Sequence, residues 1–260
     1  MRVCNLASGS DGNVTYIENG DTKILVDIGL TCPEVMRRLN MLGIMPSEIT
    51  AILITHEHYD HAKGVKNFSY KYGTPVYAHK KVWPGLVNKG YFYQTGKHII
   101  FDDDNFMIGN ICVCPIEVSH DVPCFGFSFF DDKNKLSILT DIGCVSDGIL
   151  KKVQGSKLVY LEANHDEEML KNGRYPYIIK KRVASDEGHL SNRVAAEFVS
   201  ELVKHGTKQI VLSHISKENN TPDLAFDYIC RKIAEDGIIE GKHVKIDVAG
   251  RQVGTIFKLK

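Results

Sequence analysis

The sequence of 260 residues contains no long hydrophobic run. No apolar stretch approaches the roughly 18 residues of a membrane-spanning helix, and no apolar segment as long as a secretory signal follows Met1. The seven cysteines are odd in number and form no Cys-x-x-Cys motif, so reduced thiols fit the sequence better than a disulfide framework. We therefore expect a cytoplasmic protein.

The sequence also lacks an excess of charge of either sign. Lysine plus arginine and aspartate plus glutamate each number 32, so the formal net charge is zero. This balance argues against a protein built to coat nucleic acid or an acidic membrane, although a local basic patch is compatible with it. With 43% hydrophobic and 25% charged residues, the composition is that of an ordinary globular protein that buries a large core.

Short apolar runs alternate with amphipathic stretches along the chain, and no low-complexity or linker-like segment interrupts them. The runs predict strands at 2–7, 14–18, 23–28, 51–54, 74–78, 98–101, 105–108, 111–118, 125–130, 136–139, 158–161, 209–212 and 253–258. Helical spacing predicts helices at 32–42, 65–73, 82–88, 148–153, 193–204 and 223–234. We expect one domain over residues 1–260, of α/β class, with mixed sheets flanked by helices in two similar halves.

One short loop is dense in metal-binding side chains. Directly after the buried-strand pattern of residues 51–54 the chain supplies four such groups: His56, His58, Asp60 and His61. Imidazole nitrogen and carboxylate oxygen are the donors that zinc, manganese and iron accept. Four of them packed this tightly are hard to explain as core packing, so the loop predicts a metal site.

Histidine or aspartate recurs where later strands are expected to end, at His120, Asp141 and His214. Taken singly, Asp141 could be a turn residue and His120 a capped or buried histidine. However, loops at one edge of a sheet converge in space. Together with the first loop they supply seven donors, which suffices for two metals if one carboxylate bridges and one solvent molecule is shared. Asp141 is the natural bridge, because a carboxylate has two oxygens to offer.

The segment Thr55–His61 resembles the H-x-H-x-D-H signature of the metallo-β-lactamase superfamily, and the later donors follow in that superfamily's order. The resemblance covers essentially the whole chain. It implies a four-layer αββα sandwich with a dinuclear site at one edge of the two sheets. It also implies two ligand sets: His56, His58 and His120 on the first ion, and Asp60, His61 and His214 on the second, with Asp141 bridging.

Three further segments resemble the YycJ/WalJ family of small bacterial metallohydrolases: residues 6–13, 161–166 and 185–192. Asp11 is a minor departure, because a small residue is usual there. The resemblance implies a DNA-processing enzyme with 5′-to-3′ exonuclease activity and DNA as its partner. It also implies a chain without the β-CASP insertion of larger nucleases.

Glu162 and His189 resemble a pair in ribonuclease Z in which a glutamate holds a histidine. A histidine oriented by a carboxylate can deliver a proton to a phosphodiester leaving oxygen. The alternative is that His189 merely precedes a helix cap. The loop 8–13 can approach a phosphate with hydroxyl and N–H groups, or it can be a tight hairpin. The candidate substrate contacts are Ser8, Ser10, Asn13, Ser191 and Asn192.

We therefore expect a hydrolase with two divalent ions (Zn²⁺, Mn²⁺ or Fe²⁺) that uses a metal-bridging hydroxide. Asp60 would orient this nucleophile, while His189, held by Glu162, would protonate the leaving group. The main alternatives on the same scaffold are a phosphodiesterase for small or cyclic substrates and a thioesterase of the glyoxalase II type. A di-iron redox protein is disfavoured because it would replace His58 by glutamate, and a metal-free binding module because every ligand position is filled.

Basic residues offer weaker evidence for nucleic-acid binding. The pairs at 80–81 and 151–152 are better explained as solvated helix faces. The segment Arg174–Arg182 mixes aromatic and cationic residues just before His189, as a surface that holds a strand would.

Overall fold

The computed structural model describes residues 1–93 and 96–259. The chain divides into two compact units. Unit 1 comprises Met1–Pro115, Phe130–Lys133 and Gly250–Lys260, and unit 2 comprises Ile116–Phe129 and Asn134–Ala249. No helix among the described residues combines the length and the apolar character needed to cross a membrane.

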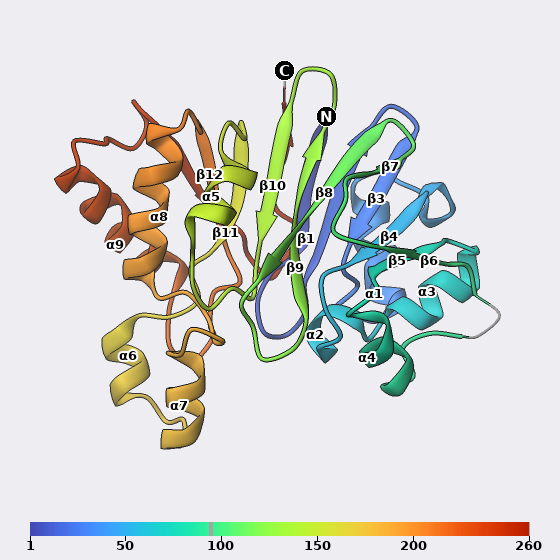
Figure 1. Cartoon of the computed structure of the whole chain (residues 1–260), viewed down its shortest axis with the longest axis horizontal. Coiled ribbons are helices and arrows are strands. Elements are labelled where there is room, and N and C mark those ends of the chain that lie inside the picture. Colours follow the sequence, from blue (N-terminus) through green and yellow to red (C-terminus); the bar gives the residue numbers. More distant parts are fainter. Residues whose placement is uncertain (94–95, 260) are drawn as a thin grey trace. The chain divides into compact units, whose positions relative to one another are not determined.

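Unit 1 is built on a seven-stranded sheet with the order β14-β1-β2-β3-β4-β5-β6 (Figure 1). Its strands are β1 (Arg2–Ala7), β2 (Val14–Asn19), β3 (Thr22–Val26), β4 (Ala51–Ile54), β5 (Val76–His79), β6 (His98–Phe101) and β14 (Ile256–Lys258). Its helical elements are α1 (Cys32–Met41), the 3-10 turn η1 (Pro46–Glu48), α2 (Tyr59–Ala62), α3 (Val65–Tyr72) and α4 (Trp83–Asn88). The strands from β14 to β3 pair antiparallel, whereas those from β3 to β6 run parallel.

The sequence explains the centre of this sheet. All four residues of β4 are buried, as expected of a parallel strand that is covered on both faces. Helix α1 starts with Pro33 in its first turn, where the missing N–H costs no hydrogen bond. Its apolar residues Val35 and Leu39 are fully buried, and the helix contacts β1 and α3.

The second sheet has the order β13-β12-β11-β10-β9-β8-β7. Its strands are β7 (Phe106–Ile108), β8 (Ile111–Val118), β9 (Cys124–Phe130), β10 (Lys135–Leu139), β11 (Leu158–Glu162), β12 (Gln209–Ser213) and β13 (Lys245–Val248). Strand β7 and the start of β8 belong to unit 1. The helices of unit 2 are α5 (Asp147–Val153), α6 (Glu167–Asn172), α7 (Tyr177–Val183), α8 (Asn192–Lys204) and α9 (Pro222–Glu235).

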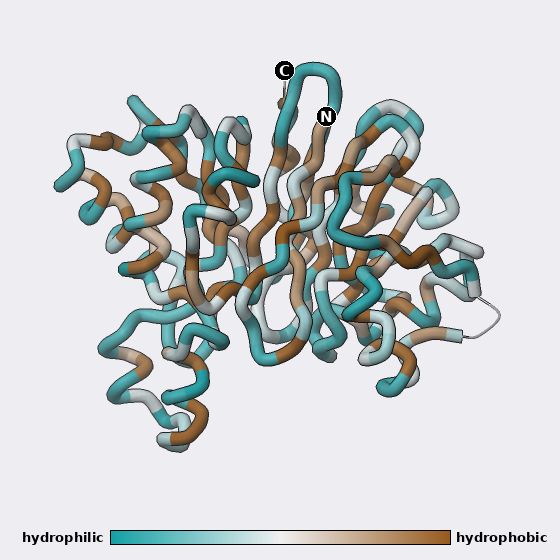
Figure 2. The backbone as a smooth tube through the Cα atoms, in the orientation of Figure 1, coloured by the Kyte–Doolittle hydropathy of each residue, from teal (hydrophilic) through white to brown (hydrophobic). Residues whose placement is uncertain are grey.

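Helices α8 and α9 complete the core of unit 2 through their apolar faces. Helix α8 buries Ala195, Phe198, Val199 and Leu202, which share one face at helical spacing. These residues belong to the same apolar cluster as Leu161 on β11. Hydrophobic and hydrophilic stretches accordingly alternate along α8 in Figure 2.

Helices α6 and α7 form a hairpin that the chain inserts between β11 and α8 (Figure 1). The sequence did not predict α7, because Tyr177, Ile178 and Ile179 are consecutive and only Val183 follows them at helical spacing. Tyr177 and Ile178 at its start are 81% and 74% exposed. The short, half-polar strand β13 also escaped prediction. The other expected elements are confirmed with small shifts at their ends, although the last strand begins at Ile256 rather than at Val253.

Parallel pairing decides where the candidate residues of unit 2 lie. Strands β10, β11, β12 and β13 run parallel, so their carboxyl ends meet at one edge of the sheet. The register aligns Leu139 with Leu161 and Leu161 with Leu212. Side chains that immediately follow these residues are therefore gathered at that edge.

Candidate metal centre

The loop after β4 is anchored from inside the fold. Thr55 donates its backbone N–H to Asp27 Oδ1 over 2.9 Å and its hydroxyl to Asp27 Oδ2 over 2.8 Å. The Thr55 hydroxyl also lies 2.9 Å from Nδ1 of His56. Because β3 and β4 are parallel neighbours, Asp27 at the end of one reaches the loop that leaves the other. The loop that carries four candidate ligands is thus fixed at its first residue.

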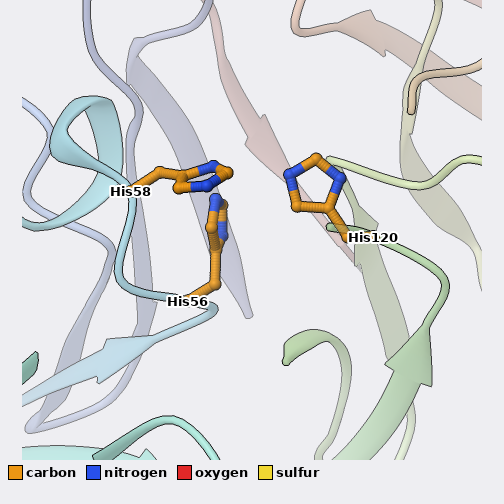
Figure 3. Close-up of side chains that lie close together, drawn as sticks. All are labelled: His56, His58 and His120. Atoms are coloured by element: carbon orange, nitrogen blue, oxygen red, sulfur yellow. The ribbon is translucent and has the colours of Figure 1, made fainter. Parts of the chain in front are cut away.

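The histidines of this loop gather with one another in unit 1. The rings of His56 and His58 lie 4.6 Å apart at an interplanar angle of 78°, and those of His56 and His61 lie 4.2 Å apart. Figure 3 shows His56 and His58 reaching out from the loop between β4 and α2, and it also labels His120, which follows β8. Asp60 Oδ2 lies 3.5 Å from His61 Nε2.

Asp27 is a site residue that the sequence analysis missed. Its Oδ2 lies 2.8 Å from Nδ1 of His61, and its side chain is 3% exposed. Burial raises the pKa of Asp27, although the hydrogen bonds from His61 and Thr55 work against this rise. The predicted strand 23–28 included Asp27, whereas β3 ends at Val26, so Asp27 in fact follows a strand as Asp141 and His214 do.

The loop 8–13 packs against the metal-type loop within unit 1. Asn13 Nδ2 lies 2.9 Å from His61 Nε2 and 3.4 Å from Asp60 Oδ2. The Asn13 side chain also exchanges hydrogen bonds with the backbone of Gly9. Ser8 is 7% exposed, whereas Ser10 is exposed. The turn therefore brings Asn13, but not Ser10, into contact with the candidate ligands of this unit.

A buried carboxylate organises the candidate site of unit 2. Glu162 Oε1 lies 2.8 Å from Nδ1 of His189 and 2.7 Å from Nδ1 of His214. Glu162 Oε2 accepts the backbone N–H groups of Ile142 at 2.9 Å and Leu190 at 3.4 Å. We expected Glu162 to hold His189, and the structure adds that the same carboxylate holds His214.

The environment of Glu162 keeps it ionised. Burial by itself raises the pKa of this carboxyl, but the charges and hydrogen bonds of His189 and His214 outweigh it and lower the pKa to about 2. A buried carboxylate that is this well bonded fixes both rings in orientation.

Asp141 lies beside these rings at the end of β10. Its Oδ1 is 3.6 Å from His214 Nδ1 and 3.8 Å from His189 Nδ1. Potential ligand atoms of Asp141, Glu162, His189 and His214 all lie within 4.8 Å of one another. Asp141 and His214 are the candidate ligands of this group, because carboxylate and imidazole bind divalent metal ions, whereas Glu162 binds the Nδ1 atoms of both histidines.

His120 joins this group from the loop after β8. Its Nδ1 lies 3.2 Å from the carbonyl oxygen of Gly188, and its Nε2 lies 3.9 Å from Asp141 Oδ1. Asp121 next to it pairs with Arg182 at 3.2 Å. The loop that carries His120 is therefore tied to the loop that carries His189.

Close backbone packing sets the position of the His189 loop. A Cβ atom on Gly143 would overlap the carbonyl oxygen of Asp186, and one on Gly188 would overlap the carbonyl oxygens of Arg182 and Val183. Both positions therefore require glycine for close approach of the backbone. His189 N–H donates to Val183 O at 3.0 Å, which adds a direct tie.

Three residues of the candidate site have strained backbones. Asp27, Asp141 and His214 have φ values of 60°, 55° and 54°, and within the described residues they are the non-glycine residues with positive φ. This left-handed conformation is unfavourable for residues with a Cβ atom and persists where the surroundings impose it. Each of the three residues lies just after a strand, where the strain turns its side chain into the site.

The donor set fits metal ions. The Nδ1 atoms of four candidate ligands are held by an oxygen from the protein, namely those of His56, His61, His120 and His214. Nδ1 contacts of this kind fix the ring and present Nε2 as the ligand atom, the usual arrangement around a protein-bound metal. The residues of each unit are therefore arranged to bind divalent metals.

The remaining candidates, Ser191 and Asn192, have structural partners. Ser191 caps α8 through Val194 N and donates to Glu167 Oε1 at 3.0 Å. Asn192 is buried, and its side chain exchanges hydrogen bonds with Asn220.

His165 is 2% exposed, and its Nδ1 has no hydrogen-bond partner among the described residues. Burial lowers the pKa of His165 to about 4.

Comparison with known families matches residues 22–215 to the β-lactamase superfamily domain. The chain is 38% identical over 246 residues to the exodeoxyribonuclease WalJ of Streptococcus pneumoniae. The aligned residues cover 93% of this chain and 91% of that protein. It is 37% identical over 244 residues to the exodeoxyribonuclease YycJ of Bacillus anthracis, with 93% and 92% covered.

Solved structures agree on the fold. The metallo-β-lactamase fold protein YhfI from Bacillus subtilis matches with a TM-score of 0.76 and 16% identity, over 98% of each chain. The Zn²⁺-bound PqqB from Methylobacterium extorquens matches with a TM-score of 0.76 and 14% identity, over 100% of each chain. These matches confirm the predicted fold class.

Replacing Asp27 by asparagine should weaken metal binding by roughly 10- to 100-fold, as is usual when the partner of a metal-binding histidine is lost. An amide offers only one acceptor oxygen, so it cannot serve both Thr55 N–H and His61. Titration of the metal-free protein with Zn²⁺ against a chromophoric chelator measures the affinity. Asp147→Asn, at an exposed position on α5, is the matched control. Wild-type affinity in Asp27→Asn would show that Asp27 does not support the ligand.

His165 should make the protein less stable in mild acid. Its imidazole titrates near 6.5 when unfolded and near 4 when folded, so the unfolded chain binds more protons between these values. The free energy of unfolding should therefore fall as the pH drops from 6.5 to 4, by at most about 3 kcal/mol from this residue. Urea denaturation of the metal-free protein should show a shallower pH dependence for His165→Asn. Parallel curves for the two proteins would contradict the assignment.

Proposed function

Because this chain belongs to the YycJ/WalJ family of the metallo-β-lactamase superfamily, we propose that it is a dinuclear metal-dependent exonuclease that hydrolyses DNA phosphodiesters in the 5′-to-3′ direction. The observation that carries this proposal is 37–38% identity over 93% of the chain to proteins named exodeoxyribonuclease. The family model spans segments of both units, which supports a single domain over residues 1–260 without a β-CASP insertion.

The proposed ligand sets follow the superfamily pattern. His56, His58 and His120 would hold one ion, and Asp60, His61 and His214 the other, with Asp141 between them. Three anchors support this assignment: Asp27 on His61, Glu162 on His214 and the Gly188 carbonyl on His120. The donors suit Zn²⁺, Mn²⁺ and Fe²⁺ alike.

When bound, two divalent ions would supply hydroxide at neutral pH and offset the negative charge on the phosphate. Asp60 would orient this nucleophile, because its carboxylate lies beside His61 and is partly exposed. The ring of His189 is 13% exposed, so it can meet a substrate. Its Nδ1 is held by Glu162, which leaves Nε2 to deliver a proton to the leaving oxygen.

Replacing a proposed metal ligand and replacing the proposed proton donor should have different effects on turnover and on metal content. Asp60→Ala or His61→Ala should abolish turnover through loss of the second ion. His189→Ala should slow turnover by roughly 10²- to 10⁴-fold with both ions retained, because it removes only the proton donor. Metal analysis and single-turnover cleavage of end-labelled duplex DNA measure the two effects. A parallel loss of metal in His189→Ala would make His189 a ligand and overturn its proposed role.

The substrate class is tested by a comparison on one enzyme preparation. We expect the protein, supplied with Zn²⁺ or Mn²⁺, to cleave 5′-phosphorylated duplex DNA in preference to single-stranded RNA, bis(p-nitrophenyl) phosphate and a glutathione thioester. The protein with His61→Ala serves as the control for contaminating nucleases. Thioester hydrolysis without cleavage of any phosphodiester would overturn the proposed function.

A further inference from the structure

A cavity of about 500 Å³ lies in unit 2, beside His189. The α6–α7 hairpin forms one wall, and the start of α8 with Ser191 and Arg193 forms another. His165 and His189 line it as well. Its volume suits a ligand of the size of one nucleotide rather than a length of nucleic acid.

The lining of this cavity carries an excess of positive charge. Four cationic side chains line it, namely Lys171, Lys180, Lys181 and Arg193, against the two carboxylates Glu167 and Asp186. Glu167 and Arg193 pair with each other, because Glu167 Oε1 lies 3.0 Å from Arg193 Nε, which leaves the three lysines against Asp186 in the lining. The chain as a whole is neutral, so the lysines are a local concentration of charge that suits a phosphate group.

An aromatic side chain completes the lining. Tyr177 lines the cavity although it is 81% exposed. A large apolar ring held in solvent has no evident role in the stability of the fold. A nucleobase can stack on such a ring whatever its identity. The cations of the cavity thus suit the phosphate of a nucleotide, and the exposed aromatic ring suits its base.

We propose that this cavity binds the 5′-terminal nucleotide of a DNA strand, with the terminal phosphate near Lys180 and Lys181 and the base on Tyr177. The inference rests on the proposed function, in which His189 protonates the leaving oxygen. The part of the substrate that departs must then lie beside His189. The cavity meets this condition, because His189 forms part of its lining.

The chemistry ties this location to the direction of cleavage. Hydroxide forms a bond to phosphorus at the first internucleotide phosphate, and the bond from phosphorus to O3′ of the terminal nucleotide breaks. That O3′ takes the proton from His189, so a nucleoside 5′-monophosphate departs. The shortened strand keeps the attacked phosphate as its new 5′ end. Cleavage from a 3′ end by the same step would instead place the long strand on the leaving side, where a bounded cavity could not hold it.

Each turnover also regenerates the group that the cavity recognises. The new end carries a 5′-phosphate, so the strand can advance by one nucleotide and fill the cavity again. A 5′-hydroxyl end lacks the group that faces the lysines. The structure therefore assigns to the α6–α7 hairpin the selection of phosphorylated 5′ ends.

Binding to the metal-free protein tests the cavity without catalysis. Isothermal titration calorimetry should show thymidine 5′-monophosphate binding at least 10-fold more tightly than thymidine. Lys181→Glu should remove most of this preference, whereas Lys151→Glu, an equal charge change at an exposed position on α5, should leave it intact. Tyr177→Ala should lower the affinity for both ligands several-fold and keep the preference for the monophosphate. Equal preference in wild type and Lys181→Glu, or no preference in wild type, would overturn the proposal.

Cleavage assays separate this proposal from the proposed function. Wild type should degrade 5′-phosphorylated duplex at least 10-fold faster than 5′-hydroxyl duplex at subsaturating DNA. Lys181→Glu should reduce that ratio to near one, whereas Lys151→Glu, the matched charge change on α5, should leave the ratio as in the wild type. A ratio unchanged by Lys181→Glu would refute the terminal site but leave the nuclease in place. No cleavage of either duplex by wild type would refute the nuclease, and the calorimetry would still decide whether the cavity binds a nucleotide.

Discussion

One buried carboxylate determines the geometry of unit 2. Glu162 ends β11 and accepts hydrogen bonds from two imidazoles and two backbone N–H groups. An unpaired carboxylate at this depth would cost several kcal/mol, so the fold requires these donors. The requirement holds together the ends of β10, β11 and β12 and the loop of His189. Stability and the orientation of His189 and His214 thus depend on the same group.

In unit 1 the buried residue Asp27 takes the place that Glu162 has in unit 2. Asp27 is buried at the end of β3 and binds Thr55 and His61, as Glu162 binds the loops of its own unit. In both units a parallel sheet brings loop ends together, and an acidic side chain beneath them fixes the rings. The positive φ values of Asp27, Asp141 and His214 show that local backbone preference was overridden to achieve this.

Much of this arrangement follows from local sequence. Apolar runs that end in histidine or aspartate predicted both the strands and the side chains at their ends, because a strand's side chains and the following loop are set over a few residues. The second contact of Glu162 with His214 could not be predicted, since it depends on which strands are neighbours and in what register. Helix α7 was missed for the opposite reason: Tyr177 and Ile178 face solvent and only Val183 of this helix is buried, so little core packing imposes helical spacing on it.

The close backbone approaches at Gly143 and Gly188 have an evolutionary consequence. Where backbone packs directly on backbone, no exchange of side chains can compensate for a mutation, so this part of the molecule has almost no neutral variants available. The exposed side chains of α7, such as Tyr177 and Ile178, are under no such restriction. Under the role proposed for the hairpin, a lineage can therefore alter substrate selection by changing these side chains while the residues around Glu162 stay fixed, and divergence among relatives should concentrate there.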